Sequence, residues 1–313
     1  MKKFLSILCI LAIVLSMSGN LYTPAEATGE DTFYVGFARM DINPYVVDGD
    51  ITSGLMQLPL RGVGDVWNRL SHQGMVDDNG DGKVDEEDGL AVTCIAVSDA
   101  NGNTVLFLTI DLIGGGMIAD VREEICTRVA AAVGSGELQN VKLEPEGIHY
   151  AGTHTHEAPD TTVYNPNGKT GTNNDGISLD EINTNLGIWM DRTIEDIGDA
   201  AIQALKDRAA ATVTKDAISA KNATSDAVSG RVMNSVRHYV AEDKGCVAGD
   251  NFNNRGSDPK QVTQVNDNLY LLKFDFEDGD KLPIILANWR GHPSGKKPTA
   301  YPITSGLKIW PIT

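Results

Sequence analysis

The segment Ile148–Asp160 reads IHYAGTHTHEAPD and carries three of the six histidines of this 313-residue chain. His154 and His156 stand two residues apart, and in an extended backbone side chains at positions i and i+2 point to the same face. Two imidazoles that point the same way can each give one nitrogen to a single zinc ion. Pro159 then ends the segment, because proline has no N–H to continue a strand ladder. The pattern predicts a zinc-binding pair at the end of a strand, with an ordinary surface pair of histidines as the alternative.

The residues before this segment predict two buried strands and a helix. Gly89–Val97 and Val105–Ile110 have the continuous apolar character of buried strands. Gly114–Gly116 then breaks the chain, and the periodicity of Met117–Val133 predicts an amphipathic helix. The expected inner stripe of this helix is Val121, Ile125, Val129 and Ala132.

A strand, a helix and a second strand form a unit whose default connection is a right-handed crossover between parallel strands. Asp111 follows the first of these strands directly, so it should lie at the same carboxyl edge as His154 and His156. Ligand sites in open α/β sheets gather at that edge. We therefore expect an α/β fold with a mixed, largely parallel sheet, flanking helices and a metal site at the carboxyl ends of the strands. Asp111 is expected either to orient a metal-binding histidine or only to cap its strand.

A third histidine follows another expected strand. Leu282–Trp289 is apolar, and it is followed by His292, directly before Pro293. A catalytic zinc ion commonly has three protein ligands and one open position for water. We therefore predict that zinc is bound by His154, His156 and His292.

The other histidines are interpreted differently. His149 is odd-spaced from His154, so in a regular strand it would face the opposite side, as a core histidine or one that supports a ligand. His72 and His238 have no partner visible in the sequence and are interpreted as ordinary polar residues. A long helix is expected over Leu179–Arg208.

The segment Asp77–Asp88 reads DDNGDGKVDEED and has the pattern of a twelve-residue calcium loop. Gly82 stands at the sharp turn, where only glycine bends at low cost. Asp88 occupies the final position, where a longer glutamate is usual. We predict a structural calcium site in an isolated loop, with a solvated acidic turn as the alternative. The expected ligands are Asp77, Asn79, Asp81, Asp85, Asp88 and the backbone carbonyl of Lys83.

The net charge of −17 limits the partners that this chain can have. A surface so acidic repels polyanions, so we expect no nucleic-acid partner and no attraction to an anionic membrane. A hydrophobic fraction of 41% is that of a globular protein with ample material for a core. The sequence contains no G-x-S-x-G elbow and no phosphate-binding loop, which disfavours a serine hydrolase and a nucleotide-dependent enzyme.

The amino-terminal residues predict a secretory signal peptide. Two lysines precede the apolar run Phe4–Met17, and an A-E-A tripeptide ends at Ala27. We expect cleavage near Ala27, a secreted or cell-surface protein, and one catalytic domain over residues 28–313; an uncleaved anchor is the alternative. One disulfide is compatible with the three remaining cysteines, Cys94, Cys126 and Cys246.

Several segments, taken in order, resemble the neutral/alkaline non-lysosomal ceramidase family in its amino-terminal catalytic domain. The most specific is THTHEAPD at Thr153–Asp160, and the second is NWRGHP at Asn288–Pro293. The resemblance extends from about Phe33 to about Ser294. Weaker matches are VGFARMDINP at Val35–Pro44, TID at Thr109–Asp111 and NSVR at Asn234–Arg237.

The resemblance implies a zinc enzyme that hydrolyses the amide bond of ceramide and releases sphingosine and a fatty acid. It implies that His154 and His292 bind zinc, and that His156 binds zinc or orients the bound water and substrate. It also implies that Arg237 contacts the amide region of the substrate. The expected catalytic residues are thus His156, Arg237 and Asp111. Proton transfer is expected from His156 first, with Glu157 and Asp160 as neighbouring candidates.

The sequence also departs from the family pattern. The family's chain continues with further zinc ligands, whereas this sequence ends at Thr313, soon after His292, and is expected to be carboxyl-terminally incomplete. The calcium loop is not typical of the family. Two alternatives stay open: a metal-dependent hydrolase of another amide or ester, and a non-catalytic metal-binding fragment. The expected partner is a lipid or other N-acyl small molecule, with peripheral membrane contact through the substrate.

Overall fold

The structure is a computed structural model, and its chain divides into two compact units. Within the described residues, the first unit extends to Val213 and includes Phe274–Ile284, and the second lies within Thr214–Lys273 and Ile285–His292. The residues described are 32–60, 83, 88–114, 116–155, 158–165, 170–173, 176–219, 238–241, 245–248, 261–263 and 268–288.

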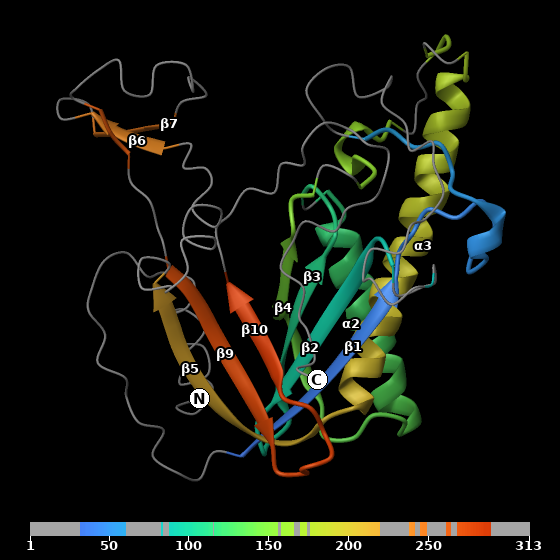
Figure 1. Cartoon of the computed structure of the whole chain (residues 1–313). Coiled ribbons are helices and arrows are strands. Elements are labelled where there is room, and N and C mark those ends of the chain that lie inside the picture. The colour runs from blue at the N-terminus through green and yellow to red at the C-terminus, as the bar shows by residue number, and fades with distance from the viewer. Residues whose placement is uncertain are drawn as a thin grey trace. The chain divides into compact units, whose positions relative to one another are not determined.

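A seven-stranded sheet has the strand order β10-β9-β5-β1-β2-β3-β4 (Figure 1). Strand β1 pairs antiparallel with both β5 and β2, and β2 pairs antiparallel with β3. Only the pairing of β3 with β4 is parallel among the registers of the described strands. The strands are β1 (Phe33–Asp41), β2 (Ala91–Ser98), β3 (Asn103–Ile110), β4 (Lys142–Gly152), β5 (Ala209–Ser219), β9 (Asn268–Phe276) and β10 (Ile284–Asn288).

The expectation of a largely parallel sheet is therefore wrong, because the sheet is mostly antiparallel. The reason lies in the connections. A tight turn joins β2 to β3, closed by the Asp99 N–H to the Asn103 carbonyl at 3.0 Å and the Gly102 N–H to the Asp99 carbonyl at 3.0 Å. So short a turn can join only antiparallel neighbours, whereas a parallel pair needs a crossover. The predicted crossover does exist, as β3, helix α2 (Ile118–Ser135) and β4.

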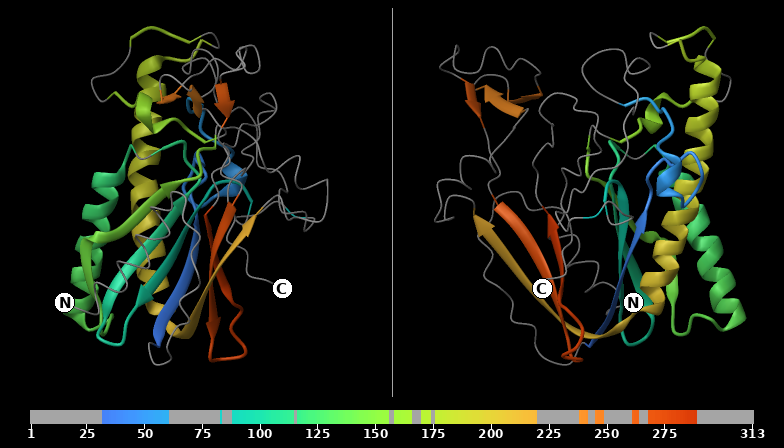
Figure 2. Two further views of the ribbon diagram at one scale, coloured as in Figure 1. Left: turned by 90° about the vertical axis from the view of Figure 1, so that its left-hand side faces the viewer. Right: turned by 45° about the vertical axis from the view of Figure 1, so that its right-hand side comes forward.

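Two helices cover one face of strands β1 to β4 (Figures 1 and 2). The first is α2, whose buried residues are Val121, Ile125, Val129 and Ala132, as the apolar period predicts. The second is α3 (Leu179–Lys206), which buries Trp189, Ile197 and Leu205. Alternate residues of the strands complete the same core, among them Val92, Cys94, Leu106, Leu108, Ile110 and Ile148.

The contact between α3 and β1 depends on Gly36. A Cβ atom at this position would lie 2.1 Å from the Ala204 carbonyl oxygen and 2.7 Å from the Arg208 amide nitrogen. Glycine is therefore what lets the backbone of α3 approach the strand. Farther along the helix, the Trp189 indole donates a hydrogen bond of 2.8 Å to the Ile42 carbonyl, so the buried indole N–H is satisfied.

The amino end of α3 is capped by its own sequence. The Ser178 hydroxyl accepts a hydrogen bond from the Asp180 N–H at 3.2 Å. Asp180 and Glu181 in the first turn place negative charge where the helix dipole is positive. No helix among the described residues is long and apolar enough to cross a membrane.

The second unit contains a three-stranded antiparallel sheet of order β7-β6-β8. Its strands are β6 (His238–Ala241), β7 (Gly245–Ala248) and β8 (Gln261–Thr263). His238, interpreted from the sequence as an ordinary residue, begins β6.

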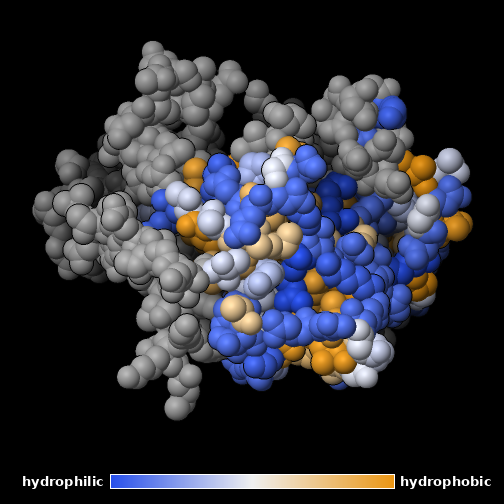
Figure 3. All heavy atoms as spheres, turned by 90° about the horizontal axis from the view of Figure 1, so that it is seen from below, coloured by the Kyte–Doolittle hydropathy of each residue, from blue (hydrophilic) through white to orange (hydrophobic). Residues whose placement is uncertain are grey.

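The described surface seen in Figure 3 is mainly hydrophilic, and its apolar residues lie in small separate patches. That distribution suits the acidic composition, with a pI near 4.7. Cys94 is buried and Cys126 is half-buried, and both are free thiols. Burial raises the pKa of each, so neither thiol has the reactive character of a nucleophile.

Candidate metal centre

The carboxyl ends of β3 and β4 meet, as the crossover predicts. Ile110 pairs with Gly152, and the Thr153 N–H then donates to the Ile110 carbonyl at 2.9 Å. The His154 N–H donates to the Leu112 carbonyl, also at 2.9 Å. The segment with His154 is thus fixed beside the segment with Asp111, at the edge where a site was expected.

Gly152 allows this close approach. A Cβ atom at Gly152 would lie 2.9 Å from the Leu112 carbonyl oxygen and 3.4 Å from the Gly114 amide nitrogen. A side chain there would push the two segments apart. Sequence reasoning did not single out Gly152, although a glycine directly before T-H-T-H is a signal of close backbone approach.

His154 has a left-handed backbone, with φ of 62°. β-Strand β4 ends at Gly152, so the premise that His154 belongs to an extended strand is wrong. The alternation that would place His154 and His156 on one face does not continue through a left-handed residue. A histidine with positive φ is uncommon and carries a conformational cost, and such residues are concentrated at functional sites.

Asp111 caps the edge of the neighbouring strand. One of its carboxylate oxygens, Oδ2, accepts a hydrogen bond from the Ala91 N–H at 3.1 Å, and its own N–H donates to the Ala91 carbonyl at 3.0 Å. Of the two roles expected for Asp111, strand-end capping is therefore present. The cap directs this carboxylate oxygen to β2, the strand on the side of β3 away from β4.

His149 lies on the sheet face opposite the helices. Its ring stacks on Phe107, with ring centroids 5.3 Å apart and an interplanar angle of 20°. Burial, and then the charge of Arg122, lowers the pKa of His149, so the imidazole is neutral near pH 7. His149 is thus a half-buried residue of the sheet and lies outside the hydrophobic core, and its second predicted role, support of a metal ligand, stays a prediction. The next residue, Tyr150, packs against the helix-covered core, and its hydroxyl donates to the Gly114 carbonyl at 3.4 Å.

The residues after the histidine segment return to the same edge. Pro159 pairs with Leu60, and the Asp160 N–H donates to the Pro59 carbonyl at 2.7 Å. The glycine-containing segment that begins at Leu60 thus starts beside this part of the chain. Asp160 is 1% exposed, and its Oδ1 accepts from the Thr162 N–H at 3.0 Å. Asp160 is therefore the cap of a short 3-10 helix, Thr161–Val163, and not an exposed base.

The buried polar side-chain atoms that have no hydrogen-bond partner include Thr153 Oγ1, Thr161 Oγ1 and Gln57 Oε1. Thr153 directly precedes His154, Thr161 lies against Gly116, and Gln57 is two residues before Pro59. Buried polar atoms are normally satisfied, so each orphaned atom is a position where a water molecule, an ion or a ligand could complete the hydrogen bond. Sequence reasoning missed these residues, because nothing in the sequence distinguishes them from other polar residues.

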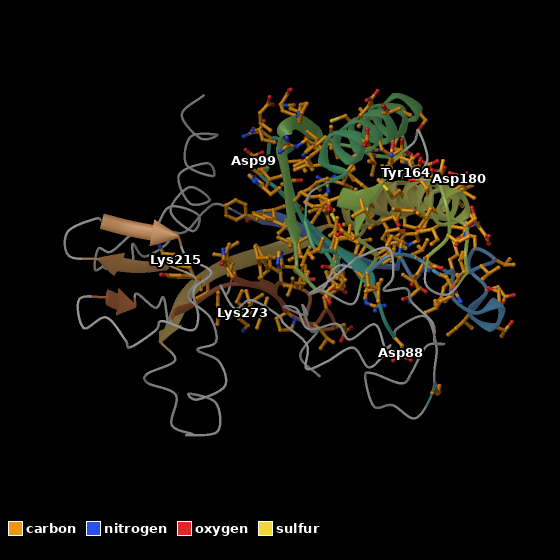
Figure 4. All side chains as sticks on the ribbon, turned by 90° about the horizontal axis from the view of Figure 1, so that it is seen from above. Asp88, Asp99, Tyr164, Asp180, Lys215 and Lys273 are labelled. Carbon is orange, nitrogen blue, oxygen red and sulfur yellow. The ribbon has the colours of Figure 1, made fainter. Side chains whose placement is uncertain are left out.

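Two expected calcium ligands lie in the described part of the chain. Lys83 is exposed, whereas Asp88 is fully buried just before β2 (Figure 4). Asn43 fixes this position: its amide donates to the Asp88 carbonyl at 3.0 Å, and its side-chain oxygen accepts from the Leu90 N–H at 2.9 Å. The carboxyl end of the expected calcium loop is thus held against the end of β1.

The segment after the short 3-10 helix packs against the amino-terminal half of α3. Tyr164 packs against the helix, since a Cβ atom at Gly187 would lie 3.1 Å from the Tyr164 ring. The Asn165 N–H donates to the Asn183 side chain at 2.8 Å, which ties the segment after Thr161 to α3.

Within the described ranges, no group of three or more His, Cys, Asp or Glu side chains is placed to hold a metal ion. Most of the predicted ligands lie outside those ranges, so the complete set of donors is not among the described side chains. Outside the described residues are His156, Arg237, His292, Asp77, Asn79, Asp81 and Asp85, together with His72 and residues 1–27.

No protein-family model matches this chain, and no curated protein matches it in sequence. It is similar to a solved neutral ceramidase from Pseudomonas aeruginosa, with a TM-score of 0.44 and 11% identity over 80% of this chain and 31% of that chain. It is also similar to a structure described as ceramidase complexed with C2, with a TM-score of 0.40 and 11% identity over 80% and 30% of the two chains. The chain thus spans less than a third of the length of either protein.

Proposed function

We propose that this chain is a secreted zinc-dependent amidohydrolase of the neutral ceramidase type. Its substrate would be ceramide or a related N-acyl lipid, and the reaction would break the N-acyl amide bond. Its support is the T-H-T-H and Asn-x-x-x-His-Pro motifs of the sequence, together with the backbone geometry around His154.

The observation that carries the proposal is the conformation of His154. The chain holds this histidine in a left-handed conformation, beside Asp111, where the ends of the only described parallel strand pair meet. A strained backbone at the ligand-binding edge of a sheet is typical of a functional residue. The orphaned Thr153 hydroxyl next to it is consistent with a bound group at this place.

The donor chemistry fits a zinc ion. His154, His156 and His292 would supply neutral imidazole nitrogens, which zinc prefers. When bound, zinc would lower the pKa of its water to about 7 and polarise the amide carbonyl. His156 would move the proton between the attacking water and the leaving amine, and Arg237 would position the amide of the substrate. Asp111, fixed by Ala91, would keep a neighbouring histidine in one orientation.

We also propose that residues 77–88 bind a structural calcium ion. The support is the oxygen-rich sequence, together with the fixed position of Asp88 against Asn43. Calcium should raise the melting temperature of the purified chain, and Asp81→Asn should abolish the increase, because it removes a charged ligand. Asp99→Asn, in the turn between β2 and β3, is the control and should keep the calcium effect. An equal calcium effect in the wild type and in Asp81→Asn would contradict this site.

The substrate class is tested by comparing several acyl compounds. Zinc-loaded protein should release fatty acid from a ceramide in detergent micelles, and His154→Gly should lose this activity. A simple aryl amide and an aryl ester serve as comparison substrates. Hydrolysis of the aryl compounds without ceramide would favour a hydrolase of other amides or esters. No hydrolysis of any of them by zinc-loaded protein would favour a non-catalytic metal-binding protein.

A further inference from the structure

The hydroxyl of Thr153 has an unusual environment in the candidate centre. Its Oγ1 is shielded from solvent and has no hydrogen-bond partner. The backbone that carries this side chain is fixed, because the Thr153 N–H is bonded to the Ile110 carbonyl at 2.9 Å. The next residue, His154, is bonded to Leu112 and held at a φ of 62°. The backbone is therefore fixed both at Thr153 and at the expected metal ligand that directly follows it.

A buried hydroxyl without a partner destabilises the folded chain, because folding removes its hydrogen bonds to water. A protein keeps such a group where a further molecule completes the hydrogen bond. Thr161 and Gln57 also have orphaned oxygens, and their two segments meet where Leu60 pairs with Pro159. For Thr153, the unsatisfied hydroxyl indicates a small polar occupant.

We propose that Thr153 is a positioning residue of the proposed zinc centre and that its hydroxyl holds the reacting water. This inference rests on the proposed function, since it assigns a partner that is present only when zinc is bound. The hydroxyl has the chemistry for the role, because it can both donate and accept a hydrogen bond. A water molecule oriented by a neutral hydroxyl keeps its lone pair directed at the substrate carbonyl. Groups that orient a metal centre in this way commonly matter for metal affinity as well as for rate.

The test uses the change Thr153→Val, which has nearly the same shape and lacks the hydroxyl. The full chain is stripped of metal with a chelator, and its melting temperature and zinc affinity are measured with and without zinc. In the metal-free chain, Thr153→Val should melt at the same or a higher temperature than the wild type, since an unsatisfied hydroxyl is lost. Zinc affinity should fall by about 10–100-fold, since an interaction of the loaded centre is lost.

Two further variants separate this role from a packing effect. Thr153→Ser keeps the hydroxyl and should recover zinc affinity to within a few-fold of the wild type. Thr193→Val is the matched control, because Thr193 Oγ1 in α3 is also buried without a partner. It should leave zinc affinity unchanged. Should Thr153→Val not fold, Thr153→Ala gives the same comparison with a smaller side chain.

The possible results are distinguishable. Unchanged zinc affinity in a folded Thr153→Val or Thr153→Ala chain, with wild-type protein that binds zinc, would overturn the role of Thr153 and leave the zinc centre standing. Wild-type protein that binds no zinc would overturn both the centre and the role of Thr153. An equal loss in Thr153→Ser and Thr153→Val would show that the shape of the side chain matters and not its hydroxyl, and would also overturn the inference.

Discussion

The backbone conformation of His154 is unfavourable by itself, and contacts with the surrounding chain hold it in place. A left-handed backbone at a non-glycine residue costs on the order of 1–3 kcal/mol, and here it is held by a hydrogen bond to Leu112 and by the close approach of Gly152. Replacement by glycine should therefore remove the imidazole and relieve strain at the same time. Replacement by alanine would keep the strain, so glycine is the better change for testing this residue.

Asp196 should make the stability of the chain depend on pH. Burial, and then neighbouring carboxylates such as Asp48 and Asp199, raises its pKa from 3.8 to about 7. The folded state then binds a proton more tightly than the unfolded state, so this group's contribution to stability falls as pH rises from about 4 to about 7 and stays low above it. Asp196→Asn should remove that loss. We expect a gain of about 1–2 kcal/mol in the free energy of unfolding at pH 8, after allowance for solvent screening, and almost none at pH 4.

Denaturant unfolding of the wild type and Asp196→Asn at the two pH values checks this expectation. Asp191→Asn is the control, because Asp191 lies exposed on the same helix. A gain for Asp196→Asn that is the same at pH 4 and pH 8 would contradict the assignment, since it would have a cause other than ionisation.

At the scale of elements, the packing of α3 on β1 should be the most sensitive contact to a single methyl group. In Gly36→Ala the added Cβ would lie 2.1 Å from the Ala204 carbonyl oxygen and 2.7 Å from the Arg208 amide nitrogen. Both are backbone atoms of the chain at the end of α3, so they cannot move aside as a side chain could. We expect a loss of roughly 2–4 kcal/mol in the free energy of unfolding. Gly134→Ala is the control: it lies in α2 with no atom within 4 Å of the new Cβ. It should stabilise the chain by about 0.5–1 kcal/mol.

Thermal or denaturant unfolding of both alanine variants provides the measurement. If Gly36→Ala were as stable as the wild type, the close approach of α3 to β1 would be wrong.

The elements themselves were largely predictable from the sequence, because each carries its own period. The stripe of α2, from Val121 to Ala132, and the apolar strands β2 and β3 have patterns that hold in the structure. Strand direction was less accessible, since it depends on the connection: the turn Asp99–Gly102 makes β2 and β3 antiparallel, whereas α2 makes β3 and β4 parallel. The hydrophobic period within one segment does not indicate which other strand that segment pairs with.

The candidate site was predictable only in its location. The crossover rule placed Asp111 and His154 at one edge, and the structure brings their segments together there. The left-handed φ of His154 was not predictable, because it follows from backbone contacts made after folding. The same is true of the buried, unsatisfied hydroxyl of Thr153.

The charge of the whole molecule should affect which lipid surfaces it works on. With a net charge of −17, the chain is repelled by anionic surfaces within a few Debye lengths. If the substrate is ceramide in a bilayer, hydrolysis should be slower on phosphatidylserine-rich vesicles than on phosphatidylcholine vesicles, on the order of tenfold at low ionic strength. The difference should shrink as salt is added. Faster hydrolysis on the anionic vesicles would show that a local basic surface governs binding instead of the net charge.

The zinc content of the purified chain tests the central claim most directly. Wild-type protein and His154→Gly are dialysed against zinc, freed of excess metal and analysed for bound zinc, with His149→Phe as the control because its ring can keep the stack on Phe107. We predict about one zinc ion per chain in the wild type and the control, and almost none in a folded His154→Gly. Equal zinc in all three proteins, or none in the folded wild type, would contradict a zinc centre that includes His154.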